Sequence, residues 1–362
     1  MHRLGISLYP EHSTQEKDFA YMELAAKYGF SRIFTCLLSV EKGAEETVAE
    51  FGGFMKRAHE LGYTVAVDTN PHVFERLGAT ATNLKPFADM GVDIIRLDGH
   101  LGDEGDIMLT RNREGIKVEF NGSGNLGLDL LVERGADKRN MVTCANFFPE
   151  PWTGMSEERF VELSRKYHKA GFQTAAFVSS QQPETFGPWP VFAGLPTCED
   201  DRRRPIDLQV RHLVGTGLID DIIIGNAFAS EDELAAMAAV DTSRVTMRID
   251  LDPGITEGER EVLWGFNHNE RGDCSEYLIR SSWPRFIFRE REIAPREAPE
   301  TFHKGDVLVV NDNMAHYRGE LHIARRDMPN DGTRNLLGRI PAEELFLLDY
   351  ILPEHPFAFI KA

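Results

Sequence analysis

The sequence has few cysteines, and they are not clustered. There are only 4 among 362 residues, at positions 36, 144, 198 and 274. Neither a zinc motif with paired ligands nor a disulfide framework fits this spacing. We therefore expect buried free thiols in a reducing compartment. The histidines at expected strand ends, His12, His72 and His100, also lack ligand spacing, so the sequence predicts no metal site.

Long hydrophobic segments are also missing. No apolar run reaches the roughly 18–20 residues that a membrane-spanning helix needs. The first residues, MHRLGISLYPEHS, lack the apolar core and the small-residue cleavage site of a signal peptide. Together with the scattered cysteines, these absences predict a cytoplasmic protein that has no membrane partner.

Positive charge is in short supply. Lys and Arg number 40 against 58 Asp and Glu, which gives a formal net charge of −18 at pH 7. Nucleic acids and anionic membrane surfaces attract proteins with cationic faces, so neither is expected as a partner. An anionic small molecule would have to be held by a local cluster of Arg, Lys or backbone amides. The composition, 42% hydrophobic and 27% charged, is typical of a folded protein.

A repeating pattern of short apolar segments and helical segments fills the first two thirds of the chain. The expected strands are 4–9, 31–36, 63–68, 93–98, 116–121, 141–146, 172–178 and 220–226. Eight strands alternating with helices over about 240 residues predict a (β/α)8 TIM barrel. A doubly wound open sheet is disfavoured, because no phosphate-binding glycine loop follows the first expected strand.

The pattern changes after about residue 243. Strand-like segments then follow one another, separated by turn sequences such as LDPG and MPNDG, and no long helix is evident. This composition predicts a second, mostly antiparallel domain that forms a small all-β barrel. We place the domains at 1–242 and 243–362, with an α/β fold overall.

Polar residues alternate with apolar ones along several barrel strands. In IKVEFN (116–121), Lys117, Glu119 and Asn121 occupy every second position. Alternate side chains of a barrel strand point to the helices and to the interior, and chemistry collects where strands end. The same alternation sends further polar side chains inward near the barrel mouth: Glu11, Asp68, Asn70, Arg96, Asp98 and His100.

Asp98 and Glu119 are the candidate catalytic pair. They lie at the ends of neighbouring strands, about 4.8 Å apart, within range of joint acid–base catalysis. In the alternative interpretation, Arg96 and Lys117, one step deeper, form a salt-bridge layer with the two carboxylates. Asp68 is either a further ligand-binding group or a structural carboxylate that caps the next helix.

Several longer motifs resemble those of a known family. In the first domain they are GISLYPEHS, IKVEFNGSG, ANFFPEPWTGMS (145–156) and GLPTCEDDR (194–202). In the second they are HNERGDCSEYLIRSSWPR (268–285) and HYRGELHIARRDMPNDGTRNLLGRI (316–340). Together they resemble the bacterial 6-phospho-N-acetylmuramidases, once catalogued as an uncharacterised family of outer-surface-like proteins. The resemblance covers nearly the whole chain.

The resemblance implies a TIM barrel joined to a C-terminal cyclophilin-like β domain. It also implies an intracellular glycoside hydrolase without a cofactor, acting on the disaccharide of N-acetylmuramic acid 6-phosphate and N-acetylglucosamine during cell-wall recycling. The family pattern falls on Glu11, Asp98, Glu119, Asn121 and Asn146 at the barrel mouth, and on Arg271, Asp273, Arg280 and Ser281 in the second domain.

The resemblance also implies a chemical role for each candidate residue. Asp98 and Glu119 supply the two groups that glycoside cleavage needs, and Trp152, an aromatic residue expected at the barrel mouth, would stack on a sugar ring. Arg271, Arg280 and Ser281 would hold the phosphate, so the second domain is expected to cover the barrel mouth. Their alternative role is an interdomain salt-bridge set with Asp273 and Glu276. Asp68, Glu11, Asn121 and Asn146 would bind the sugar.

Two other functions stay open from the sequence. One is a phosphosugar isomerase, epimerase or aldolase that uses Glu119 or Lys117. The other is a phosphosugar-binding protein without turnover. The sequence also leaves open the stereochemical outcome and the oligomeric state, a homo-oligomer included.

Overall fold

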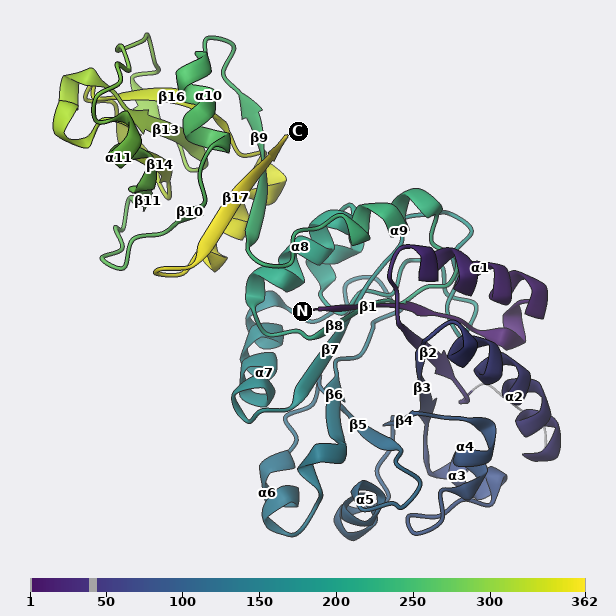
Figure 1. The fold of residues 1–362 in the computed structure, drawn as a ribbon. Helices are drawn as coiled ribbons and strands as arrows, with labels where there is room; N and C mark the ends of the chain where they lie inside the picture. The colour runs from purple at the N-terminus through teal and green to yellow at the C-terminus, as the bar shows by residue number, and fades with distance from the viewer. Residues whose placement is uncertain (1, 39–43, 362) are drawn as a thin grey trace. The chain divides into compact units, whose positions relative to one another are not determined.

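The computed structural model describes residues 2–38 and 44–361. The chain divides into two compact units, Met1–Val240 and Asp241–Ala362 (Figure 1). The division falls two residues before the expected boundary at 242. No helix among the described residues combines the length and the apolar composition that crossing a membrane requires.

The first unit contains a closed barrel of parallel strands, with β1 hydrogen-bonded to both β2 and β8. In order around the barrel the strands are β1 (Arg3–Ser7), β2 (Arg32–Cys36), β3 (Thr64–Thr69), β4 (Ile94–Leu97), β5 (Lys117–Asn121), β6 (Met141–Cys144), β7 (Gln173–Val178) and β8 (Asp221–Ile224). Each overlaps an expected strand, so the predicted (β/α)8 barrel is confirmed.

Helices surround the barrel (Figure 1). They are α1 (Gln15–Lys27), α2 (Ala44–Glu60), α3 (Pro71–Leu77), α4 (Lys85–Met90), α5 (Asp103–Thr110), α6 (Leu128–Glu133), α7 (Glu157–Lys169), α8 (Ile206–Thr216) and α9 (Glu231–Ala238), with 3-10 turns η1 (Pro10–His12), η2 (Lys138–Asn140) and η3 (Glu199–Arg203). Local sequence sets their ends. Ser156 caps α7 by accepting a hydrogen bond from the Arg159 N–H. Gly91 ends α4 at φ 86°, a conformation that favours glycine.

Side chains alternate between two separate cores, as the sequence predicts. Ile95 and Val118 belong to the core between strands and helices. Phe34 and Phe177 belong to a core inside the barrel, where their ring centroids are 5.1 Å apart. This second core fills the barrel interior. Inward-facing polar groups therefore lie mainly at the strand ends, and those buried deeper form ion pairs with one another.

The second unit is built on a mixed seven-stranded sheet of order β10-β17-β9-β16-β13-β14-β11, with a separate pair β12-β15. The elements are β9 (Val245–Leu251), α10 (Glu257–Trp264), β10 (His268–Asn269), β11 (Leu278–Ser281), α11 (Trp283–Phe288), β12 (Thr301–Phe302), β13 (Asp306–Val310), η4 (Asp312–Tyr317), β14 (Leu321–Ala324), β15 (Met328–Pro329), β16 (Arg334–Arg339), η5 (Ala342–Tyr350) and β17 (Pro356–Lys361).

The pairing in this sheet is antiparallel except between β9 and β17, which run parallel. The mostly antiparallel arrangement agrees with the sequence, and the one parallel pair and two short helices were not expected. The two ends of the sheet approach each other, since the Arg271 N–H donates to the Arg280 carbonyl at 3.1 Å. The sheet therefore curls almost to closure.

Candidate active site

A cavity of about 260 Å³ lies at the carboxyl ends of the barrel strands. Its lining residues are Leu38, Asp68, Arg96, Asp98, Asn146, Phe147, Pro149 and Trp189. They follow or end strands β2, β3, β4, β6 and β7, which converge here because parallel strands of a barrel share one mouth. Three of the sequence-predicted site residues, Asp68, Asp98 and Asn146, are thus brought together.

Arg96 organises the floor of this cavity. Its Nη1 donates to Asp68 Oδ1 at 2.6 Å, and its Nη2 donates to Asn146 Oδ1. Arg96 and Asp68 are 3% and 4% exposed, so the guanidinium neutralises a carboxylate that water reaches poorly. Because Arg96 occupies the carbonyl oxygen of Asn146, the Asn146 Nδ2 is the group this residue can offer to a ligand.

Asp68 and Asp98 differ in their surroundings. Burial raises the pKa of Asp68 to about 6, although the contact with Arg96 opposes the shift. The Asp98 side chain is 44% exposed, and its Oδ1 lies 4.0 Å from Arg96 Nη1. The cavity thus contains one carboxyl group that is shielded from water and one that is exposed to it, and such unlike surroundings are typical of carboxyl pairs with different roles.

Glu119 lies one layer deeper than Asp98. On β4 the residue in register with Glu119 is Arg96. Asp98 comes two residues after Arg96 and is therefore closer to the barrel mouth than Glu119. The side chain of Glu119 is fully buried and is bonded by the guanidinium of Arg32, which also bonds Asp221. The other oxygen, Oε1, has no hydrogen-bond partner within the described part of the chain.

The cation that compensates Glu119 is therefore Arg32 from β2, which corrects the expectation that Lys117 would do so. Arg32 occupies the second position of the expected strand 31–36, next to the outward Ile33, so the alternation already aimed it inward. Only the closed barrel brings β2, β5 and β8 close enough for one guanidinium to bond two carboxylates.

The other expected sugar-binding residues do not line the cavity. Asn121 Oδ1 accepts the Ser123 N–H at 2.9 Å, and Glu11 is half-buried in η1. Trp152 is 77% exposed at φ 73°, with the Arg203 guanidinium 5.2 Å from its ring centroid. The tryptophan that lines the cavity is Trp189, in the long connection after β7. Sequence patterning offered no signal for it, because that connection has no regular periodicity.

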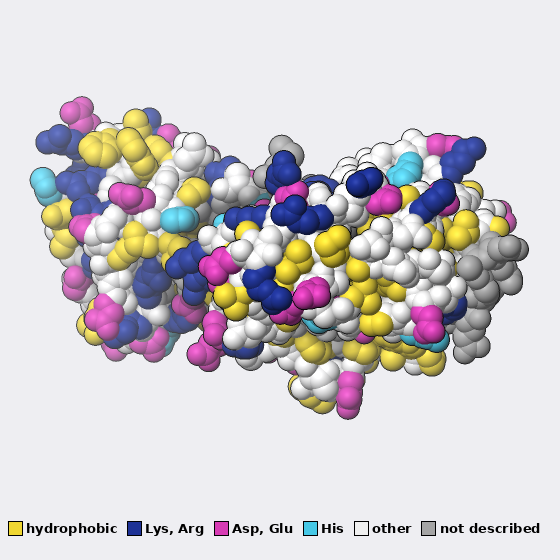
Figure 2. All heavy atoms as spheres, turned by 90° about the horizontal axis from the view of Figure 1, so that it is seen from below, with side chains coloured by type: hydrophobic (Ala, Val, Ile, Leu, Met, Phe, Trp, Pro, Cys, Tyr) yellow, Lys and Arg dark blue, Asp and Glu magenta, His cyan; other side chains and the backbone are white. Residues whose placement is uncertain are grey.

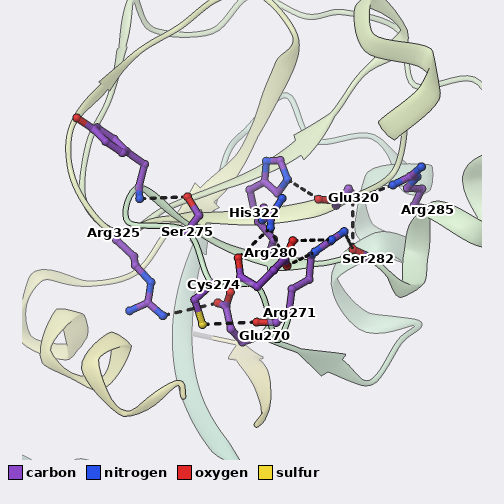
Figure 3. Close-up of polar contacts among 12 residues, drawn as sticks. Glu270, Arg271, Cys274, Ser275, Arg280, Ser282, Arg285, Glu320, His322 and Arg325 are labelled. Atoms are coloured by element: carbon purple, nitrogen blue, oxygen red, sulfur yellow. Dashed lines mark hydrogen bonds and ion pairs between the residues drawn. The ribbon is translucent and has the colours of Figure 1, made fainter. Parts of the chain in front are cut away.

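In the second unit, the two expected phosphate-binding arginines, both labelled in Figure 3, share one counter-ion, Asp273. Arg271 donates to Asp273 through Nε at 2.7 Å and Nη2 at 2.9 Å, and Arg280 Nη2 donates to Asp273 Oδ1 at 2.9 Å. These contacts lower the pKa of Asp273 below its usual range. Arg271 Nη1 also donates to Ser282 Oγ at 3.3 Å.

Ser281 lies apart from this pair of arginines. It is fully buried, and its Oγ is 3.0 Å from His268 Nδ1. Successive residues of a strand point to opposite faces, so Ser281 points into the unit while Arg280 lies on the other face. Ser282 follows the strand, and its Oγ accepts the hydrogen bond from Arg271. Ser282 is therefore the hydroxyl beside the arginines, and Ser281 packs in the interior.

Surface charge is mixed, although the chain is strongly acidic overall. On the face shown in Figure 2, dark blue Lys and Arg side chains are interspersed with magenta Asp and Glu. Local clusters of cationic side chains therefore exist despite the net charge of −18, as an anionic ligand would require.

By fold and by site, this chain belongs to the class of TIM-barrel proteins that carry a carboxylate pair at the barrel mouth. The model of the 6-phospho-N-acetylmuramidase N-terminal region matches residues 4–239, and that of the C-terminal region matches residues 245–360. The chain is therefore a member of the 6-phospho-N-acetylmuramidase family, as its motifs indicated.

Two solved structures are similar over nearly the full length. An uncharacterized B. cereus protein is 38% identical, with a TM-score of 0.91 and coverage of 99% of this chain and 100% of that one. A conserved Enterococcus faecalis protein with an unknown function is 23% identical, with a TM-score of 0.70 and coverage of 99% and 96%. The second supports the fold alone. No curated protein matches this chain.

Proposed function

We propose that this protein hydrolyses the glycosidic bond between N-acetylmuramic acid 6-phosphate and N-acetylglucosamine, in the recycling of cell-wall fragments in the cytoplasm. The observation that carries the proposal is the cavity in which Asp68 and Asp98 face the same space from unlike environments. Glycoside cleavage needs an acid to protonate the leaving oxygen and a charged group to stabilise the oxocarbenium-like transition state. Membership of the family supports the same chemistry.

The geometry favours Asp68 as the acid. With a pKa of about 6 it holds a proton near neutral pH in a useful fraction of molecules. Asp98, whose side chain is open to the cavity, is the second carboxyl group. It stabilises positive charge on the sugar ring, or holds the acetamido group if the substrate's own carbonyl attacks. In this proposal Asn146 Nδ2 binds sugar hydroxyls and the ring of Trp189 stacks on a sugar face, since both residues line the cavity.

Asp68 thus takes the role that the motif assigned to Glu119. A fully buried carboxylate held by Arg32 has no open path to a ligand in the cavity. We propose that Glu119 acts as the buried counter-ion of Arg32 and supports the β5 wall of the barrel. Substitution of Asp68 and of Glu119, one at a time, distinguishes the acid from the structural counter-ion.

Product analysis tests the function directly. Incubation with the phosphorylated disaccharide should release free N-acetylglucosamine, whereas an isomerase, epimerase or aldolase would leave the glycosidic bond intact. A binding protein without turnover would instead show ligand-induced thermal stabilisation and no product after prolonged incubation. Either of these two results would contradict the proposal.

The pH dependence of turnover follows from Asp68. If its protonated form is the acid, kcat/KM should be highest below pH 6 and fall about tenfold per pH unit above the pKa of about 6. The profile is measured from pH 5 to 8 for the whole protein and for Asp68→Asn. The residual activity of the variant should lose this limb, and a flat wild-type profile would remove Asp68 as the acid.

We also propose that Arg271 and Arg280 bind the 6-phosphate, exchanging the Asp273 carboxylate for the ligand. Arg280→Ala should raise KM for a phosphorylated substrate about 10–100-fold, the equivalent of about 1.5–3 kcal/mol for a charged hydrogen bond. KM for the unphosphorylated analogue should hardly change. Arg291→Ala is the matched control, since Arg291 is an exposed arginine of the same unit paired with Glu261. Equal effects on both substrates would assign Arg280 to packing.

A further inference from the structure

Three side chains of metal-ligand type meet outside the candidate active site. They are Glu157 at the start of α7, Cys198 just before η3, and His212 within α8. One ligand atom from each lies within 4.8 Å of the others. None of the three lines the cavity at the barrel mouth. Glu157 and Cys198 are 41 positions apart in the sequence, so spacing alone gave no sign of the cluster.

The histidine is oriented in the way that metal-binding histidines are. His212 is fully buried, and its Nδ1 lies 2.8 Å from Asp201 Oδ2. Asp201 is itself held by Arg204 at 2.9 Å. A ligating histidine commonly gives its second ring N–H to a carboxylate, which fixes the tautomer and aims the other nitrogen at the metal. Here that other nitrogen, Nε2, points to Glu157 Oε2 at 2.7 Å.

We propose that Cys198 Sγ, His212 Nε2 and Glu157 Oε2 bind a zinc ion, with Asp201 as the supporting carboxylate. Thiolate, imidazole and carboxylate are all common zinc ligands. Zinc bonds of about 2.0–2.3 Å require Glu157 Oε2 and His212 Nε2 to separate by less than about an ångström. The Glu157 side chain is 38% exposed, so solvent leaves room for that movement. The same exposure admits water as a fourth ligand.

A proton on the His212 ring competes with zinc for this site. Although burial opposes it, the carboxylates of Asp201 and Glu157 raise the pKa of His212 to about 9, so without a metal the ring is held as an imidazolium between two anions. Zinc would replace the proton on Nε2 and the one on the Cys198 thiol, since both ligands bind metal in their deprotonated forms. Metal uptake therefore differs from simple ion pairing by a measurable release of acid.

A metal ion at this site would cross-link two loops that form part of the cavity wall. The loop between β6 and α7 carries Phe147 and Pro149, and the connection between β7 and α8 carries Trp189. These segments already meet through Met155, whose N–H donates to Thr197 and whose carbonyl accepts from Glu199. A metal bound by Glu157 and Cys198 would hold the two loops in one arrangement and stabilise the barrel mouth.

The test is zinc binding by the full-length protein. After incubation with zinc chloride and removal of excess metal, elemental analysis should find one zinc per chain, with proton release in weak buffer. Cobalt(II) added to the apoprotein should give thiolate-to-metal absorption in the near ultraviolet. Cys198→Ser should lose that absorption and most of the zinc, while Cys274→Ser, which removes an exposed thiol in the other unit, should keep both.

Two further variants keep the proposal falsifiable if Cys198→Ser does not fold. Glu157→Ala changes a half-exposed residue and should weaken zinc binding while leaving a folded protein. Asp201→Asn should weaken it about 10–100-fold, the usual effect of losing a supporting carboxylate. Wild-type protein that retains no zinc and releases no protons would overturn the proposal. Equal zinc affinity in wild type and Cys198→Ser would do the same.

Discussion

Asp98→Asn should lower kcat for the phosphorylated muramyl disaccharide by about 10²–10⁴-fold, the range that a positioned acid–base or charge-stabilising carboxylate contributes. Asn keeps the size and much of the hydrogen bonding of Asp98 but removes its charge. The side chain is 44% exposed, and its ion-pair contact with Arg96 is long, at 4.0 Å, so the fold and the binding of substrate should survive.

The measurement is steady-state kinetics together with the thermal midpoint of each protein. Asp129→Asn is the matched control, because Asp129 is an exposed carboxylate on α6 outside the cavity. A control with unchanged kinetics and an Asp98→Asn variant with unchanged KM would place the loss in the chemical step. Near-normal kcat in Asp98→Asn would refute the proposed site.

Arg32→Met should destabilise the protein by about 3–5 kcal/mol, the usual result of removing one partner from a buried ion pair. The substitution leaves buried Glu119 without its paired guanidinium, whereas Asp221 keeps its contact with Arg3 at 2.6 Å. For a unit of this size such a loss lowers the thermal midpoint by roughly 6–20 °C. Urea denaturation followed by circular dichroism measures it.

Arg57→Met is the control for an exposed ion pair. Arg57 contacts Glu23 and Glu60 on the surface, and pairs of this kind contribute at most about 1 kcal/mol. Similar effects of the two arginine substitutions would contradict the assigned role of Arg32. Glu119→Gln completes the series: a loss of stability fits a counter-ion, whereas lost turnover at full stability would restore Glu119 as a reacting group.

The periodicity of the sequence was enough to determine the barrel. Alternation in segments such as 116–121 arises because a strand has a period of two and one of its faces must pack against helices. That local rule correctly predicts that the side chains of Ile95 and Val118 face the helices. It also correctly predicts that Arg96 and Glu119 face the barrel interior. It also located Asp68 and Asp98 at strand ends, which is where the cavity lies, whereas Asn146 was expected there only from the family resemblance.

Only the tertiary structure determines how deep a side chain lies in the barrel and which residues it contacts. Whether Glu119 meets a ligand or Arg32 depends on the register between strands and on which strands face each other across the barrel, and neither is encoded within one strand. The same holds for Trp189 at the cavity and for Glu157, Cys198 and His212 outside it. Sequence determines the face on which a side chain lies because backbone geometry is local, whereas its neighbours depend on long-range packing of the whole chain.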